Sequence, residues 1–509
     1  MADRVGRPVG WRVSGFPAIA LVVGLWGVLY LPNLRTNPSW YGDETLTLMI
    51  GRSLFEGVGA DRAFQPTFWH PSYSYQPVFA WLVGMAAAMT GNDIWGPRLL
   101  NTLIALAIAL AIALLGRRPF GRWGALFASL TFVGYGQTVI HFRWIYPHNA
   151  VALGFTIMVL YLLRRASRTN DWRAGLGLAC AAASHPLFVH GAIGAWLCRL
   201  KRPQSWLRLG IPAGLVLLAA TGWTLSRQFP HGWLFSDVQT LGRFYGEFNR
   251  QNGSDWIQVT RNVVSFIRMD TFHTLAFVSV CLCCNRRFYA IPIVVGVVGG
   301  LLLQNRQNLP VFYYQAVVFL PVLAMAFAGA LWTLRKWIRF RVGAVGWVRI
   351  LPLAMMLIPI TLCLSSAVSA VSGRLVPRNA PWVTQDTKEV EAAAEWINSR
   401  VMPEDLVLCH QNIGWLLRCR NADLMQATAW SGRPTFSFDP PPAPERFRFP
   451  LDLIGVKFVV IADIDQRWTV TQPNVTAFIE PISSGKWPIV WRGANYIILQ
   501  NPTSLKKLP

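Results

Sequence analysis

Two adjacent carboxylates, Asp43 and Glu44, follow the first apolar segment of the chain. They belong to residues 40–45, Trp-Tyr-Gly-Asp-Glu-Thr. If the apolar segment before them is a membrane-spanning helix, as we expect, this is where it emerges into water. A carboxylate at such a boundary can accept the proton of a substrate hydroxyl or bind a metal ion. The structural alternative is that Asp43 caps a helix and Glu44 lies in its first turn. A cap and a catalytic role do not exclude each other.

Acidic residues are rare in the part of the chain that surrounds this pair. Of the 24 acids, eleven fall in residues 1–382 and thirteen in residues 383–509. Because residues 383–509 also hold thirteen bases, the whole net charge of +23 lies in residues 1–382. Basic residues in excess in an apolar part of the chain are typical of cytoplasmic loops of a membrane protein, which lie near anionic lipid head groups. The chain has no compact basic stretch that would favour binding of nucleic acid.

Long apolar segments must position these residues. The chain is 53% hydrophobic and 14% charged, whereas a soluble domain carries about 25% charged residues. Repeated apolar runs near the length of a bilayer predict a polytopic α-helical membrane protein with about 11 transmembrane helices. We expect these helices at residues 14–32, 96–116, 122–140, 149–164, 173–185, 187–199, 207–226, 262–283, 287–304, 311–333 and 349–372.

Clusters of arginine and lysine predict the orientation. With a cytoplasmic N-terminus, every cluster between successive spans falls on the cytoplasmic side. The long loop 33–95 and the segment 373–509 then lie on the outer face. Within that loop, residues 78–85 are apolar but short, which favours a helix lying along the membrane surface. A full span there is the alternative, and it would invert every later loop.

The composition becomes that of a soluble domain after the last apolar run. Residues 1–372 are predicted to form the membrane domain and residues 373–509 a small α/β domain on the outer face. Within the latter we expect a helix at 389–400 and strands at 405–408, 456–462 and 496–499. Cys409 and Cys419 could form a disulfide if this domain faces an oxidising compartment.

Several short motifs, taken in their order, resemble the GT-C membrane glycosyltransferases. The resemblance covers about residues 10–335 and is closest to bacterial relatives of dolichyl-phosphate-mannose protein mannosyltransferase and of the lipid A aminoarabinose transferase. It rests on residues 40–44 after the first span, Phe55-Glu56-Gly57, His70-Pro71-Ser72-Tyr73, residues 96–101 (Gly-Pro-Arg-Leu-Leu-Asn), residues 143–149 and Ser184-His185-Pro186.

The resemblance implies a polyprenyl-phosphate-linked sugar donor, an acceptor glycosylated on the outer face, and inversion at the anomeric carbon. Asp43 matches the acidic residue of the first-loop motif, the presumed base or metal-proximal carboxylate. Its neighbour Glu44 is a second candidate catalytic residue, which could orient Asp43 or bind the acceptor or a metal ion. Family members often carry an acid five residues after the second-loop arginine, and here that position is His148, followed by Asn149. Whether the site binds a divalent metal ion is therefore left open by the sequence; Asp43 and His148 would be its ligands.

Transfer from such a donor needs a base, a cation and an apolar groove. The carboxylate takes or orients the acceptor proton, the cation holds the departing phosphate, and the groove holds the isoprenoid chain. Arg143 and Arg306 are the phosphate candidates, and their alternative is an arginine that snorkels to the membrane surface. His70, His148 and Asn149 are candidate sugar or phosphate contacts, although a histidine beside proline more often makes a structural hydrogen bond. Arg98 is expected to tether the first loop.

The leading hypothesis is an inverting glycosyltransferase of the bacterial inner membrane, with Asp43 as base. Its acceptor would be a lipid, glycan or protein. The alternatives are a transporter or lipid flippase, and an inactive GT-C relative that serves as an assembly partner. A transporter is disfavoured because the acids lie in loops and no internal repeat is visible.

Overall fold

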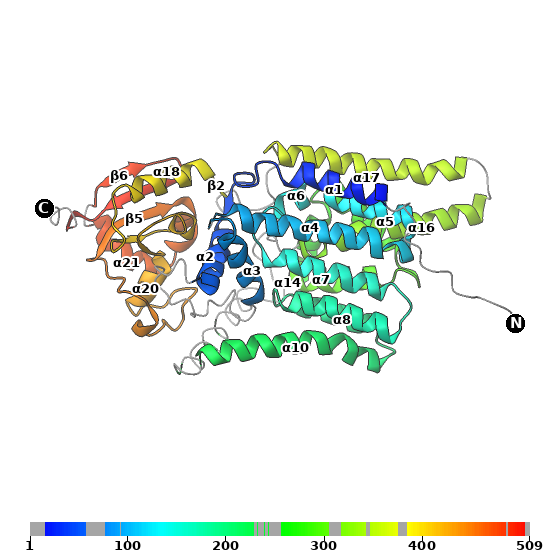
Figure 1. Cartoon of the computed structure of the whole chain (residues 1–509), viewed down its shortest axis with the longest axis horizontal. Helices are drawn as coiled ribbons and strands as arrows, with labels where there is room; N and C mark the ends of the chain where they lie inside the picture. Colours follow the sequence, from blue (N-terminus) through cyan, green and yellow to red (C-terminus); the bar gives the residue numbers. More distant parts are fainter. Residues whose placement is uncertain are drawn as a thin grey trace.

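The protein is a bundle of long helices with a small α/β domain at one end, as the computed structural model shows (Figure 1). The structure describes residues 16–56, 77–91, 93–228, 256–304, 317–342, 347–374, 384–484 and 487–503, and isolated positions between 229 and 255. Each of the eleven predicted spans contains a helix. These helices are α1 (Phe16–Tyr30), α4 (Trp95–Leu115), α5 (Arg117–Gly134), α7 (Pro147–Leu162), α8 (Arg168–Ala182), α9 (Phe188–Cys198), α10 (Pro203–Gln228), α12 (Trp256–Ile267), α13 (Thr271–Leu282), α14 (Ala290–Gln304), α16 (Leu320–Val342) and α17 (Trp347–Val371).

Apolar helices of membrane-spanning length make this an integral membrane protein. Three described helices are long and apolar enough to cross a bilayer, namely Trp95–Leu115, Pro203–Trp223 and Val317–Ile338, and six further apolar helices are shorter. The helices run side by side along the long axis of the molecule (Figure 1). Helices suit a lipid environment because each satisfies the hydrogen bonds of its own backbone.

Two predicted spans are interrupted. The span at 262–283 consists of α12 and α13, which are bent by 110° relative to each other. Asp270 takes an extended backbone at the break, and its carboxylate caps α13 by accepting from the backbone N–H of His273. The span at 122–140 ends at Gly134, and the short helix α6 (Gly136–His141) follows after Tyr135. Asp at a cap and Gly on either side of Tyr135 favour a break over a continuous helix.

Two short helices lie between the bundle and the α/β domain. They are α2 (Gly42–Glu56) and α3 (Pro77–Ala88), so the predicted helix at 78–85 is confirmed. Figure 1 shows α2 across the direction of the bundle helices. The two helices touch backbone to backbone, because a Cβ built on Gly84 would lie 2.0 Å from the carbonyl oxygen of Gly51.

The C-terminal domain is built on a five-stranded mixed sheet. Its strand order is β4 (Arg420–Ala422), β3 (Leu406–Leu408), β5 (Val456–Ala462), β7 (Tyr496–Gln500) and β6 (Ile489–Arg492). β3 runs parallel to β4 and β5, whereas β7 is antiparallel to both of its neighbours. The predicted helix at 389–400 corresponds to α18 (Thr387–Asn398), and the three predicted strands correspond to β3, β5 and β7. The helices α20 (Leu424–Trp430) and α21 (Pro473–Ser484) and the strands β4 and β6 were not predicted. Cys409 and Cys419 are both buried in this domain.

The first loop and the C-terminal domain also share a strand pair. β1 (Trp40–Tyr41) pairs antiparallel with β2 (Thr384–Gln385), so that Trp40 lies opposite Gln385 and Tyr41 opposite Thr384. This pair brings the C-terminal domain against the residues that immediately precede Asp43.

Candidate active site

Glu44 forms a buried ion pair with Arg98 at the start of α4. Nε and Nη2 of Arg98 each donate to one carboxylate oxygen of Glu44, both at 2.7 Å. Neither side chain has any exposed surface. Two parallel bonds between guanidinium and carboxylate are the strong form of this contact, and a buried pair persists when its remaining donors are also satisfied.

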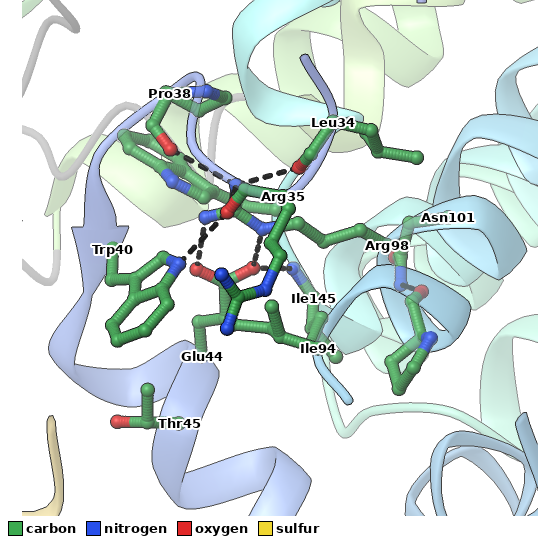
Figure 2. A network of polar contacts seen from close by, with 12 residues as sticks. Leu34, Arg35, Pro38, Trp40, Glu44, Thr45, Ile94, Arg98, Asn101 and Ile145 are labelled. Atoms are coloured by element: carbon green, nitrogen blue, oxygen red, sulfur yellow. Dashed lines mark hydrogen bonds and ion pairs between the residues drawn. The ribbon is translucent and has the colours of Figure 1, made fainter. Parts of the chain in front are cut away.

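The third nitrogen of Arg98 holds the first loop. Its Nη1 donates to the carbonyl oxygens of Leu34, Arg35 and Pro38 at 2.9, 3.2 and 3.0 Å. Figure 2 shows Arg98 reaching between these carbonyls and the carboxylate of Glu44. The prediction that Arg98 tethers the first loop is therefore confirmed.

The loop between α6 and α7 is attached to the same centre. The backbone N–H of Ile145 donates to Oε1 of Glu44 at 3.2 Å. Asn101, one helical turn after Arg98 on α4, accepts from Nδ2 of Asn149 at 2.8 Å. Nδ2 of Asn149 also bonds to the carbonyl oxygens of His141 and Trp144. The buried amide of Asn149 thus shapes the loop between α6 and α7.

Arg143 lies in this loop with 1% of its surface exposed. Its Nη2 donates to the carbonyl oxygen of Pro32, and its Nε has no hydrogen-bond partner among the described residues. No described carboxylate pairs with it. Burial, and then the nearby charge of Arg98, lower the pKa of Arg143 to about 10, so the group is still cationic at neutral pH.

His148 lies on the side of the loop that faces the turn between α8 and α9. It is 5% exposed, and its ring centroid is 4.4 Å from that of His185. The ring of Tyr146 is 6.0 Å away. Among the described residues no group of three His, Cys, Asp or Glu side chains is arranged to hold a metal ion. Two imidazoles alone are a partial ligand set, so a metal at His148 stays a prediction.

Three predicted site residues are not fully described. The backbone of Asp43 lies in the first turn of α2, and its side chain is outside the described residues. His70 and Arg306 also lie outside them.

A further polar cluster occupies the break between α12 and α13. The hydroxyl of Tyr135 donates to Oδ2 of Asp270 at 2.5 Å, and Nδ1 of His273 lies 2.9 Å from Oδ1 of the same carboxylate. A cavity of about 180 Å³ lies beside it, lined mainly by apolar side chains such as Phe327 and Leu362. The three polar groups satisfy one another and stabilise the bend.

The hydrogen bonds of Glu44 indicate a structural role for this acid. Glu44 has both carboxylate oxygens engaged, which suits a residue that fixes geometry. Asn101 was not predicted as a site residue, although its spacing of three from Arg98 in an apolar helix is a signal that two polar side chains share one face. The centre can hold two loops rigidly next to a buried arginine.

The family model described as dolichyl-phosphate-mannose-protein mannosyltransferase matches residues 70–188. An undecaprenyl phosphate-alpha-4-amino-4-deoxy-L-arabinose arabinosyl transferase of Pseudomonas fluorescens is 27% identical over 264 residues, which is 47% of this chain and 46% of that protein. The matched part thus spans about half the length of this relative.

Solved structures match over far more of the chain. The crystal structure of ArnT from Cupriavidus metallidurans bound to undecaprenyl phosphate covers 98% of this chain and 99% of its own, with a TM-score of 0.61 and 15% identity. An oligosaccharyltransferase of Archaeoglobus fulgidus covers 94% of this chain and 72% of its own, with a TM-score of 0.54 and 12% identity. The chain therefore has the fold of the GT-C membrane glycosyltransferases and resembles their bacterial aminoarabinose-transferase branch.

Proposed function

We propose that this protein transfers a sugar from a polyprenyl-phosphate donor to an acceptor hydroxyl at the outer face of a bacterial inner membrane. The observation that carries the proposal is Arg143, a buried cation for which no described carboxylate compensates. A buried unpaired charge is costly, so an anion beside it is stabilised. The phosphate of the donor, which becomes the leaving group, is such an anion. The likeness to an ArnT bound to undecaprenyl phosphate supports this class of donor.

Asp43 is the proposed base. Its neighbour Glu44 is committed to Arg98 and to the backbone N–H of Ile145, which leaves Asp43 as the acid of the pair for chemistry. In the proposed step, the acceptor oxygen attacks the anomeric carbon as its proton passes to Asp43. The bond from that carbon to the phosphate oxygen breaks on the opposite face. The configuration is thereby inverted, and the phosphate departs with the negative charge that Arg143 offsets.

The experiment uses the purified full-length chain in lipid nanodiscs. It is incubated with radiolabelled undecaprenyl-phosphate-linked pentose or hexose and with a membrane lipid extract as the source of acceptor. We expect labelled product from wild type and a fall of at least about 1,000-fold in kcat for Asp43→Asn, which keeps the shape of the side chain and removes the base. Wild-type turnover with an unaffected Asp43→Asn variant would remove Asp43 from the chemistry. No transfer from any donor would leave the inactive assembly partner as the better reading.

A further inference from the structure

The C-terminal domain contacts β1 and α2, on either side of Asp43 in the chain. Before it, the rings of Trp40 and Trp415 meet edge to face with centroids 5.0 Å apart. After it, the hydroxyl of Thr45 donates to Oδ1 of Asn412 at 2.7 Å. Trp40, Thr45 and Asn412 have no exposed surface, and Trp415 is 7% exposed. These contacts therefore exclude water and are directional.

The two contacting residues come from one short segment. Asn412 lies in α19 (Gln411–Gly414), and Trp415 follows it directly. The carbonyl oxygen of Trp415 also accepts from Nη1 of Arg52, two turns further along α2, at 3.3 Å. Residues 411–415 thus touch α2 at its first turn and again near its C-terminal end.

The other faces of α2 are held by the membrane domain. Glu44 is pinned by Arg98, and Gly51 lies against the backbone of Gly84 in α3. Without the contacts from the C-terminal domain, α2 would stay attached to Arg98 and to α3. The face that now packs against the C-terminal domain would be unsupported, and the helix could shift in that direction. Asp43, in the first turn, would move with it.

We propose that Asn412 and Trp415 are positioning residues of the transfer site, which hold the first turn of α2 and so place Asp43 against the donor. The inference rests on the proposed function for its catalytic consequence. It assigns the C-terminal domain a direct part in the geometry of the membrane-boundary site. Reactions that depend on a near-attack geometry can lose on the order of 100-fold in rate when a reacting group is displaced by about 1 Å.

The test compares Asn412→Leu and Trp415→Ala with wild type, as full-length chains in nanodiscs. Amide hydrogen exchange of residues 40–56 reports the position of α2 without any substrate. We expect exchange there to rise on the order of tenfold. In the transfer assay kcat should fall between about 10-fold and 100-fold, whereas KM for the donor should change by less than about threefold, because Arg143 is untouched.

Two matched variants separate positioning from a general loss of stability. Trp415→Phe keeps the edge-to-face contact, and it loses no hydrogen bond because the indole N–H has no partner among the described residues. Its kcat, unlike that of Trp415→Ala, should be within about threefold of wild type. Val475→Ala creates a cavity in an apolar cluster of the C-terminal domain that is separate from residues 411–415. Val475 lies in α21 and is fully buried in that cluster. This substitution should lower the Tm and leave both kcat and the exchange of residues 40–56 as in wild type.

The outcomes are distinct. Wild-type exchange in residues 40–56 for both Asn412→Leu and Trp415→Ala would overturn the inference, as would a kcat loss no greater than that of Val475→Ala. If wild type transfers no sugar while the two variants still raise exchange, the proposed function fails and the coupling of the C-terminal domain to α2 stands.

Discussion

Glu44 and Arg98 face each other across the boundary between the first loop and α4, joined by two bonds of 2.7 Å and sealed from solvent. Through the other hydrogen bonds of Arg98 and the backbone N–H of Ile145, these two side chains hold the first loop, the start of α4 and the loop between α6 and α7 together. Their ion pair commits Glu44 to a structural role, which is why the base that we propose is Asp43.

Glu44→Gln should destabilise the whole membrane domain. The substitution leaves the charge of Arg98 buried without its carboxylate, which costs on the order of 3–5 kcal/mol. We expect a clear drop in Tm of the full chain in nanodiscs. The control is the partly exposed pair of Lys457 and Asp405 in the C-terminal domain, whose side chains are 22% and 25% exposed; Asp405→Asn there should cost less than about 1 kcal/mol. Equal Tm losses for both variants would contradict the conclusion that the buried ion pair of Glu44 stabilises the membrane domain.

Arg143→Gln should weaken the binding of undecaprenyl phosphate at least about 10-fold, because a charge-assisted contact with the phosphate is lost. Arg143→Lys should give an intermediate affinity, since lysine keeps the charge and loses the fork of donors. Affinity is measured by titrating the carrier lipid into nanodiscs and following intrinsic tryptophan fluorescence. Arg287, which donates to the carbonyl oxygen of Pro119 elsewhere in the bundle, supplies the control variant Arg287→Gln. An Arg143→Gln variant that binds like wild type would remove Arg143 from the phosphate site.

Gly84→Ala should separate α3 from α2. The added Cβ would lie 2.0 Å from the carbonyl oxygen of Gly51, and backbone at that distance must move. We expect a loss of stability of about 1–3 kcal/mol and a parallel loss of transfer activity. Gly296→Ala is the control, because nothing lies within 4 Å of the added atom. A Gly84→Ala variant with the Tm and activity of Gly296→Ala would show that the close contact does not position α2.

The C-terminal domain should lose stability as the pH rises from about 4 to about 7. Burial raises the pKa of Asp465 to about 7, so the folded protein keeps a proton that the unfolded chain releases near pH 4. Stability is therefore greatest below the unfolded pKa, falls through this window and is constant above it. Asp465→Asn, which keeps an acceptor for the backbone N–H of Ala462, should flatten the dependence and raise stability at pH 7.5 by on the order of a few kcal/mol. Thermal unfolding at pH 5.0 and 7.5 measures both effects; an unchanged pH profile for Asp465→Asn would exclude this carboxyl as the cause.

The proposed orientation predicts opposite labelling of two exposed positions. Ile454 in the C-terminal domain is 87% exposed and Phe340 near the end of α16 is 85% exposed. In a background where the exposed Cys281 and Cys284 are replaced by serine, Ile454→Cys should react with an impermeant maleimide on intact spheroplasts. Phe340→Cys should react only after the membrane is opened. The reverse pattern would place Asp43 on the cytoplasmic side and remove the proposed outer-face transfer.

The sequence by itself determined the class of protein and the chemistry available to it. Apolar runs of bilayer length dictate helices because lipid satisfies no backbone hydrogen bond, and each predicted span contains a helix. The nearly continuous, valine-rich apolar run at 456–462 likewise predicted β5 with its bounds. Because acids are scarce in residues 1–382, the sequence marks Asp43 and Glu44 as candidate functional residues. Charged side chains are costly at a membrane, and those that occur there are commonly functional.

Only the tertiary structure decided which distant groups these residues meet. Asn412 and Thr45 are 367 positions apart, and Glu44 and Arg98 are 54 apart. No local pattern specifies which distant groups meet, because such contacts depend on how whole helices and a separate domain pack. The breaks at Tyr135 and Asp270 were missed for a related reason: hydropathy alone measures the length of an apolar run, whereas a cap and its partners bend it. The packing of α2 between Arg98, Gly84 and Asn412 is therefore a property of the folded chain and not of any segment within it.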